Sequence, residues 1–180
     1  MPGLYYMNDM TIRKITVNDV AVLSAIARQT FYDTFTGTCS ETDMQGFLDK
    51  YFNESKLAQE LSDENDHYFF AELDGVPVGY LQFMEDYSGF ALMKQWKALE
   101  LKRIYVLKEY HGQGVARLLM EFILEYARQH AYEVVWLGVW EHNLRAQRFY
   151  EKYGFVNSGH THDFPIGDTP QTDFWFWKFL

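Results

Sequence analysis

The chain has 180 residues, a formal net charge of -9 and 48% hydrophobic residues. This length favours one domain, and this apolar content excludes a chain that is disordered throughout. A single cysteine, Cys39, excludes an internal disulfide framework and a cysteine-rich zinc site, and is typical of a cytoplasmic protein. Because no signal peptide begins the chain and no apolar run reaches the roughly 20 residues of a membrane helix, we expect one domain over 1–180 with no membrane partner.

Acidic residues are concentrated in one part of the chain. Residues 38–90 hold twelve Asp and Glu against two Lys, whereas residues 91–180 hold ten acidic and eleven basic residues. A surface of this charge repels the phosphates of nucleic acid and attracts a cationic substrate. A solvated acidic surface that only aids solubility explains the same pattern, so the charge argues against nucleic acid without identifying a substrate.

The first half of the chain predicts a strand, three helices and a hairpin. Apolar residues recur at helical spacing from Val20 to Phe31, and Asp74-Gly75 between two apolar runs is a hairpin signal. In chain order, the expected elements are a strand over 10–15, a helix capped by Asn18 or Asp19, helices that begin at Ser40 and Asn53, strands over 67–73 and 76–84, and a loop over 85–97.

The second half alternates strands and helices. Apolar residues at helical spacing predict a long amphipathic helix over 114–130, and Gly154 ends a shorter helix over 143–153. Strands are expected over 99–107, 134–139, 155–162 and 172–179. Since strands precede, separate and follow the helices, we predict an α/β fold, a mixed sheet flanked by helices.

The stretch from Arg103 to Leu118 carries the strongest chemical signal. Gly112 and Gly114 lie between an apolar strand and a helix, where they let the backbone turn tightly. The first N–H groups of the helix lack internal partners and suit phosphate oxygens. No Gly-Lys-Ser/Thr follows, which excludes a Walker loop. On the glycine spacing alone, a connection that binds nothing is the simpler interpretation.

Two motifs resemble those of the GCN5-related N-acetyltransferases. His111-x-x-Gly114-x-Ala116 resembles motif A of that family, although His stands where the family has Arg or Gln. Motif B is matched at every named position, by Asn143, Ala146, Phe149, Tyr150, Gly154 and Phe155. Together with the hairpin near Asp74, the resemblance covers roughly residues 67–160. It implies a twisted sheet of about seven strands, in which the parallel strands 99–107 and 133–139 splay at their C-terminal ends.

The resemblance also implies a cosubstrate and a reaction. It implies acetyl-CoA without a metal, the pyrophosphate on residues 111–117, the pantetheine arm along the strand before them, and a direct attack by a primary amine. The expected cofactor-binding residues are Ile104, Tyr105, Val106, His111, Gly112, Gln113, Gly114, Val115, Ala116, Arg117, Asn143 and Tyr150. A protein or peptide N-acetyltransferase and a non-catalytic acyl-CoA sensor are the alternatives.

Two residues are expected to be catalytic. The resemblance implies that Tyr150 protonates the departing thiolate, and a phenol with a pKa near 10 stays protonated at pH 7. Glu100 is the candidate base that deprotonates the amine, directly or through a water chain. Strand alternation puts Glu100, Lys102, Ile104 and Val106 on one face, and the resemblance implies a base here because some family members carry a catalytic glutamate at the corresponding point of this strand. The alternatives are a core aromatic for Tyr150 and a surface carboxylate for Glu100.

The N-terminal half resembles the PaiA-like spermidine/spermine N-acetyltransferases. The stretch Phe31 to Phe35 and the closing Gln171-Thr-Asp173 carry this resemblance, which implies a small, cationic, polyamine-like acceptor. The expected acceptor-site residues are Phe31, Tyr32, Phe35 and Tyr80, with core packing as the alternative. His160-x-His162 lacks an identifiable third ligand, so we expect no metal, and a homodimer is possible in such folds.

Overall fold

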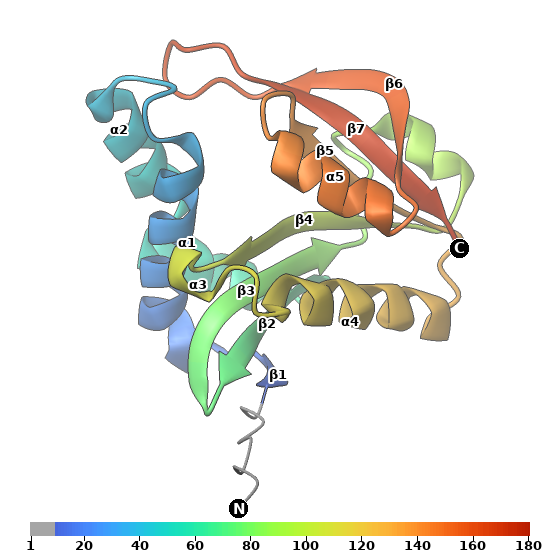
Figure 1. The fold of residues 1–180 in the computed structure, drawn as a ribbon, viewed down its shortest axis with the longest axis horizontal. Helices are drawn as coiled ribbons and strands as arrows, with labels where there is room; N and C mark the ends of the chain where they lie inside the picture. The colour runs from blue at the N-terminus through green and yellow to red at the C-terminus, as the bar shows by residue number, and fades with distance from the viewer. Residues whose placement is uncertain (1–9) are drawn as a thin grey trace, which may run out of the picture.

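The computed structural model describes residues 10–180 and holds seven strands in one mixed sheet, with helices against both faces (Figure 1). The strand order is β1-β2-β3-β4-β5-β7-β6, and β4 and β5 form the parallel pair. The strands are β1 (Met10–Lys14), β2 (Asp66–Leu73), β3 (Val76–Met84), β4 (Ala98–Val106), β5 (Val134–Trp140), β6 (Val156–Asp163) and β7 (Thr172–Phe179). The helices are α1 (Val20–Phe35), α2 (Glu41–Tyr51), α3 (Glu54–Leu61), α4 (Val115–Gln129) and α5 (Leu144–Lys152). The expected α/β fold is confirmed, while residues 1–9 of the expected domain lie outside the described residues.

Side-chain caps begin α2 and α3, as the sequence predicts. The Ser40 and Asn53 side chains accept hydrogen bonds from the N–H groups of Asp43 and Lys56 at 3.1 and 2.8 Å, which satisfies one orphan donor of α2 and one of α3. The expected loop before β4 is mostly irregular but contains a 3-10 turn over Ala91–Gln95.

The start of α1 differs from the prediction. A 3-10 turn over Val17–Asp19 precedes α1, so Asn18 lies inside the turn and does not cap the helix. The Asp19 carboxylate accepts from the Thr16 N–H at 2.9 Å and from the Arg13 guanidinium at 3.0 Å. Because these donors occupy the carboxylate, it makes no hydrogen bond to the first turn of α1.

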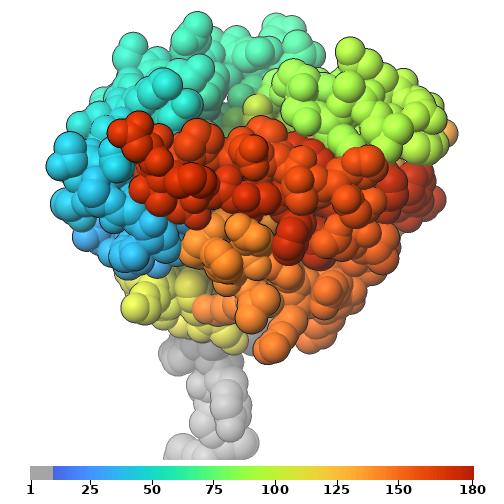
Figure 2. Space-filling view, turned by 90° about the horizontal axis from the view of Figure 1, so that it is seen from above, coloured from blue at the N-terminus to red at the C-terminus, as the bar shows by residue number. Residues whose placement is uncertain are grey.

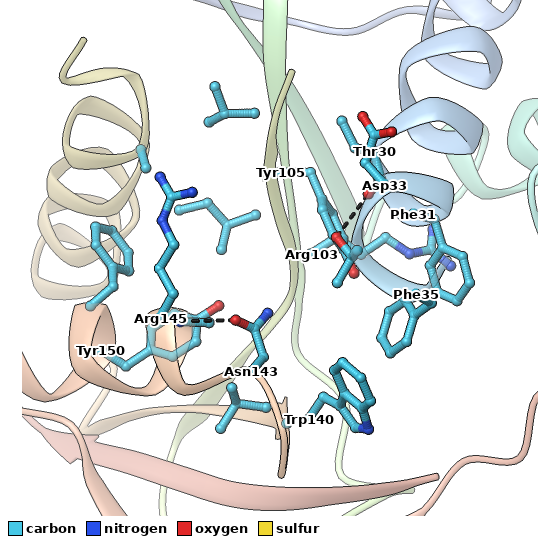
Figure 3. A pocket seen from close by; sticks show the side chains of 18 of the residues that line it. Thr30, Phe31, Asp33, Phe35, Arg103, Tyr105, Trp140, Asn143, Arg145 and Tyr150 are labelled. Atoms are coloured by element: carbon cyan, nitrogen blue, oxygen red, sulfur yellow. Dashed lines mark hydrogen bonds between the residues drawn. The ribbon is translucent and has the colours of Figure 1, made fainter. Parts of the chain in front are cut away.

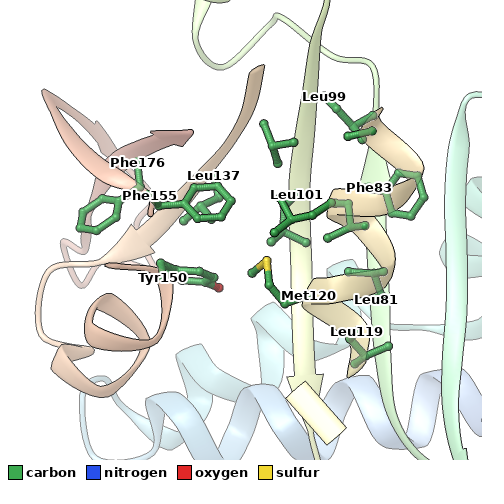
Figure 4. Close-up of a cluster of buried hydrophobic side chains, with 14 of the residues drawn as sticks. Leu81, Phe83, Leu99, Leu101, Leu119, Met120, Leu137, Tyr150, Phe155 and Phe176 are labelled. Atoms are coloured by element: carbon green, nitrogen blue, oxygen red, sulfur yellow. The ribbon is translucent and has the colours of Figure 1, made fainter. Parts of the chain in front are cut away.

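Two apolar clusters hold the helices on the sheet. One lies between the sheet and helices α4 and α5, and the other between the opposite face and helices α1, α2 and α3. Figure 4 shows the first cluster, with Leu101 of β4 beside Leu119 and Met120 of α4 and with Tyr150 of α5 across from them. Each fully buried aliphatic or aromatic side chain contributes roughly 1.5–3 kcal/mol to stability. Within residues 10–180, every helix is too short or too polar to cross a membrane.

Strand β4 contains one extra residue. Gln82 of β3 lies opposite Arg103, whereas its neighbour Phe83 lies opposite Leu101, so Lys102 has no partner of its own. This irregularity is a β-bulge, which locally reverses the alternation of side chains between the two faces of a sheet.

The bulge overturns one expectation about the faces of β4. Beyond the bulge, Ile104 and Val106 pack on the α4 side of the sheet and Tyr105 packs on the α1 side. Before the bulge, Leu99 and Leu101 pack on the α4 side of the sheet. Because side chains alternate along a strand, Glu100 between them lies on the α1 side. The expectation that Glu100, Lys102, Ile104 and Val106 share one face is therefore wrong.

Strands β4 and β5 separate after three paired residues. Their parallel register ends at Glu100 opposite Trp136, although β4 continues to Val106 and β5 continues to Trp140. The predicted splay of the two central strands is confirmed. The sheet is closed at the level of Glu100 and open beyond it.

The connection between β6 and β7 reaches the N-terminal helices. The Phe164 ring meets the Phe35 ring edge-on with centroids 5.5 Å apart, and Gln171 Nε2 donates to Thr38 Oγ1 at 3.3 Å. Figure 2 shows this red segment as a band that adjoins the blue and cyan surface of the N-terminal helices. The contact places the start of β7 beside the C-terminal end of α1.

Candidate active site

A cleft of about 590 Å³ opens where β4 and β5 separate (Figure 3). Helix α1 forms one wall, helix α5 and the first turn of α4 form the other, and the two strands lie between them. Since α1 and α5 lie against opposite faces of the sheet, the cleft passes through the sheet. Its lining residues include Phe31, Asp33, Tyr105, Asn143, Tyr150 and Asp173.

Two glycines set the turn from β4 into α4. Gly112 has a φ of 79° and Gly114 a φ of 88°, in the left-handed region that other residues rarely adopt. Gly114 directly precedes α4, whose first N–H groups have no partner within the helix and suit phosphate oxygens. Within the expected 111–117 stretch, His111 and Ala116 line the cleft, and the other five residues form the turn and helix start beside it.

Basic side chains accompany this turn. Lys108 and Arg145 line the cleft beside His111. Arg117 is exposed and lies 3.7 Å from Glu121 in an i,i+4 ion pair, outside the cleft lining. This end of the cleft is therefore positively charged, which fits the phosphates of a nucleotide.

His111 joins the turn to β4 and to α5. Its Nδ1 lies 2.9 Å from Arg145 Nη1, and its Nε2 lies 2.8 Å from the Val106 carbonyl oxygen. A guanidinium only donates, so Nδ1 accepts and the N–H of Nε2 donates to Val106. His111, which stands where the family has Arg or Gln, therefore stabilises the turn and orients Arg145.

The main chain of β4 is open toward the gap. The Leu107 N–H donates to the Val78 carbonyl of β3 at 2.9 Å. In an antiparallel pair alternate residues point their peptide groups to the same side, so Tyr105 faces β3 while Ile104 and Val106 face the gap. Within the described residues, the Val106 carbonyl accepts from His111 Nε2, and the other peptide groups on this side of β4 are open to pairing with an extended segment.

Tyr150 is buried but reaches the cleft. Its ring packs against Phe149 and Phe155, with centroids 5.6 and 5.9 Å away, and 8% of the residue is exposed. Burial raises the pKa of the Tyr150 phenol, so the hydroxyl is protonated at neutral pH. The hydroxyl makes no hydrogen bond to any described residue and can donate to a group in the cleft. About two turns before, Asn143 caps α5 by accepting from the Ala146 N–H at 3.1 Å.

The α1 wall of the cleft carries charges of both signs. Two of its cations have acidic partners, since Lys102 lies 3.7 Å from Asp86 and Arg103 lies 3.5 Å from Glu60.

Asp33 of α1 and Asp173 of β7 are the acids on this side of the cleft, and neither has a cationic partner within residues 10–180. Asp33 accepts one hydrogen bond from Gln29 and forms no ion pair within the described residues. Asp173 has neither a hydrogen bond nor an ion pair to residues 10–180. The uncompensated charge on this side is therefore negative.

Asp173 is a site residue that the sequence did not predict. It occupies the second position of β7, opposite Trp140 of β5 and His162 of β6. Burial raises the pKa of its carboxyl group to about 7. The Gln171-Thr-Asp173 stretch was the available signal, but only the strand register shows that Asp173 reaches the gap.

Glu100 lies outside the cleft. It faces Trp136 at the last β4–β5 pair, where the sheet is still closed, and it does not line the cleft. Burial is the main reason that the pKa of its carboxyl group is raised to about 7; nearby Asp86 and Asp66 act in the same direction, and Lys102 and Arg103 oppose them. Its role as a base stays a prediction.

The four expected acceptor-site residues divide evenly. Phe31 and Phe35 line the cleft, with ring centroids 4.5 Å apart. Tyr32 points toward Glu41 on the surface, and Tyr80 is completely buried behind Tyr105. Neither Tyr32 nor Tyr80 lines the cleft, because successive residues of a helix point apart and because Tyr105 separates Tyr80 from the gap.

His160, His162 and Cys39 are not among the residues that line the cleft. His160 and His162 are exposed on β6, and no three potential metal ligands cluster within residues 10–180. Cys39 follows α1 and is not among the residues that line the cleft.

Comparisons with known proteins agree with this geometry. A sequence profile described as the Acetyltransferase (GNAT) family matches residues 27–155. An uncharacterized N-acetyltransferase of Lactobacillus delbrueckii subsp. lactis is 37% identical over 174 residues, which cover 97% of this chain and 99% of the relative. An uncharacterized N-acetyltransferase of Mycobacterium bovis is 32% identical over 158 residues, which cover 88% of this chain and 96% of the relative.

Solved structures show the same fold. The PaiA N-acetyltransferase of Thermoplasma acidophilum, in complex with coenzyme A, superposes with a TM-score of 0.77 at 21% identity over 96% of this chain and 99% of that one. YncA, a putative acetyltransferase of Salmonella typhimurium solved with acetyl-CoA, superposes with a TM-score of 0.65 at 22% identity. The match covers 96% of this chain and 94% of that one. Profile, relatives and fold agree that the chain belongs to the GNAT family of acetyltransferases.

Proposed function

We propose that the protein transfers the acetyl group of acetyl-CoA to a primary amine of a small cationic molecule. The separation of β4 from β5 carries this proposal, because it opens a gap that has phosphate-binding geometry at one end and an unpaired acid beside its middle. Two structural neighbours were solved with coenzyme A or acetyl-CoA, which supports the same cosubstrate here.

The residues of the cleft fit acetyl-CoA. The first N–H groups of α4, with Lys108 and Arg145 beside them, would hold the phosphates. The open peptide groups of Ile104 and Val106 would hold the pantetheine amides as a neighbouring strand does. When bound, acetyl-CoA supplies a thioester, and the Val106 N–H would donate to the oxyanion that forms during attack.

Tyr150 has the position of a proton donor. Its hydroxyl belongs to the α5 wall, beside the gap in which the thiol end would lie. A thiolate that leaves the tetrahedral intermediate needs a proton, and the Tyr150 phenol holds one at neutral pH.

The negative charge on the α1 side of the cleft supports a cationic acceptor. Among the described residues, Asp33 and Asp173 have no cationic partner, whereas Lys102 and Arg103 are paired with acids. An acceptor with several ammonium groups, such as spermidine, would neutralise these carboxylates.

Two measurements test the function. We expect calorimetry to show acetyl-CoA binding at roughly micromolar dissociation constants, and its absence would contradict the proposal. Thiol release should then depend on spermidine rather than on a peptide with a free N-terminus. Preference for the peptide would identify a peptide N-acetyltransferase, and binding without release on any amine would identify a sensor.

A further inference from the structure

We propose that Asp173 is the base that accepts the proton of the incoming ammonium group. This assignment rests on the proposed acetyl transfer and adds a residue to it. Transfer to an amine requires a neutral nitrogen, and a carboxylate within hydrogen-bond reach of the ammonium can remove its proton.

The carboxylate of Asp173 lies over the gap in the sheet. Its partner in the β5 register is Trp140, but its carboxylate lies toward Gly138, where an added Cβ atom would lie 2.8 Å from Asp173 Oδ2 and 2.8 Å from the Trp175 ring. A residue without a side chain at 138 leaves this space to the carboxylate and the ring. Gly138 lies two residues beyond Trp136, where the β4–β5 pairing ends, so the carboxylate sits where the sheet is open.

Asp173 and Tyr150 approach the gap from opposite faces. Phe174, the next residue of β7, packs in the cluster under α4 and α5, so Asp173 points to the α1 face. Tyr150 belongs to that same cluster under α5. An acceptor that enters along α1 would therefore meet the carboxylate, while the thiol would meet the phenol on the other face.

The surroundings of Asp173 leave its carboxylate available to an ammonium group. The titratable groups that face it are Tyr105 from β4, Tyr150 from α5 and His162 from β6, with Asp33 of α1 across the cleft. Strand β5 adds only Gly138 and Trp140. Within residues 10–180, no cation pairs with Asp173, and burial raises the pKa of its carboxyl group to about 7. It is therefore a stronger base than an ordinary Asp, whose pKa is near 3.9.

The protons balance over the reaction. The ammonium gives one proton to Asp173, and the neutral nitrogen forms a bond to the thioester carbon. The C–S bond then breaks, the nitrogen loses a second proton to water as the amide forms, and Tyr150 protonates the sulfur. Water reprotonates Tyr150 and removes the proton from Asp173, so one proton is released per turnover.

Asp173→Asn tests the assignment, because asparagine keeps the shape and loses the basicity. Spermidine-dependent thiol release is measured from about pH 5.5 to about pH 9, with acetyl-CoA binding measured by calorimetry. In the wild type, we expect kcat/KM to rise with a midpoint near pH 7, since Asp173 must be deprotonated. In the variant, we expect about 100-fold lower kcat/KM at pH 7, unchanged acetyl-CoA affinity and a deficit that shrinks toward pH 9, where free amine is more abundant.

Two further variants make the result specific. Asp168→Asn removes an exposed carboxylate from the same β6–β7 region and should leave the profile unchanged. Glu100→Gln removes the other carboxyl group whose pKa is raised to about 7. Loss of the midpoint near pH 7 in the Glu100 variant but not in the Asp173 variant would overturn the assignment. A wild type without spermidine-dependent release would instead refute the proposed function.

Discussion

The Tyr150 side chain packs in the apolar core and also lines the cleft. Its ring packs among Phe149, Phe155 and the apolar residues under α4, which fixes the direction in which the hydroxyl points. The hydroxyl itself has no hydrogen bond to a described residue, so it adds little to stability. Removing the oxygen alone should separate the two roles.

We expect Tyr150→Phe to lower kcat about 100-fold, because the thiolate would leave without a positioned proton donor. The acetyl-CoA dissociation constant and the free energy of unfolding should stay close to those of the wild type. Steady-state kinetics, calorimetry and urea denaturation measure the three quantities. A variant that keeps its kcat would show that water protonates the sulfur.

At the scale of single elements, the turn before α4 depends on the backbone conformation of Gly114. Its φ of 88° strains any other residue, although the nearest atom to an added Cβ, Met10 Cε, is 3.9 Å away. The cost of a substitution there is therefore one of conformation rather than of space.

We expect Gly114→Ala to destabilise the protein by about 1–2 kcal/mol and to weaken acetyl-CoA binding, since relieving the strain would move the first N–H groups of α4. Gly46→Ala is the matched control, because Gly46 lies inside α2 with no atom within 4 Å of an added Cβ. That change should stabilise the protein by about 0.5–1 kcal/mol. Equal effects of the two changes on binding would contradict this account.

The elements differ in how far the sequence predicted them. The helix from Asn143 to Gly154 was predicted because its cap, its spacing and its terminal glycine are all local signals. The bulge at Lys102 was not predicted, because an extra residue in one strand can be recognised only when the pairing with the neighbouring strand is known. That bulge is why the placement of Glu100 failed, and the pairing of β7 with two distant strands is why Asp173 was missed.

Across the whole molecule, buried carboxyl groups link stability to pH. Burial raises the pKa of Asp66 to about 6 and that of Glu100 and Asp173 to about 7, above the unfolded values near 4. Between about pH 4 and 7 the folded protein therefore binds more protons than the unfolded chain at these sites, so they lower stability as pH rises. His67, whose pKa is lowered by burial, acts in the opposite direction below about pH 6.5.

We expect Asp66→Asn to raise the free energy of unfolding more at about pH 7.5 than at about pH 4.5. Asparagine removes the buried charge and keeps one side-chain oxygen that can accept from Gln82 Nε2, which donates to both Asp66 oxygens at 2.9 Å in the wild type. Urea denaturation at the two pH values measures the difference. A gain that is independent of pH would show that the buried charge of Asp66 is not responsible.

The gap between β4 and β5 also bears on the kinetic mechanism of the proposed reaction. Because it opens on both faces of the sheet, the proposed amine would arrive along α1 while the proposed acetyl-CoA stays bound against α4 and α5. Both reactants then occupy one ternary complex, and no acetylated form of the protein needs to exist between them. Double-reciprocal plots for such an enzyme intersect, and they do not run parallel.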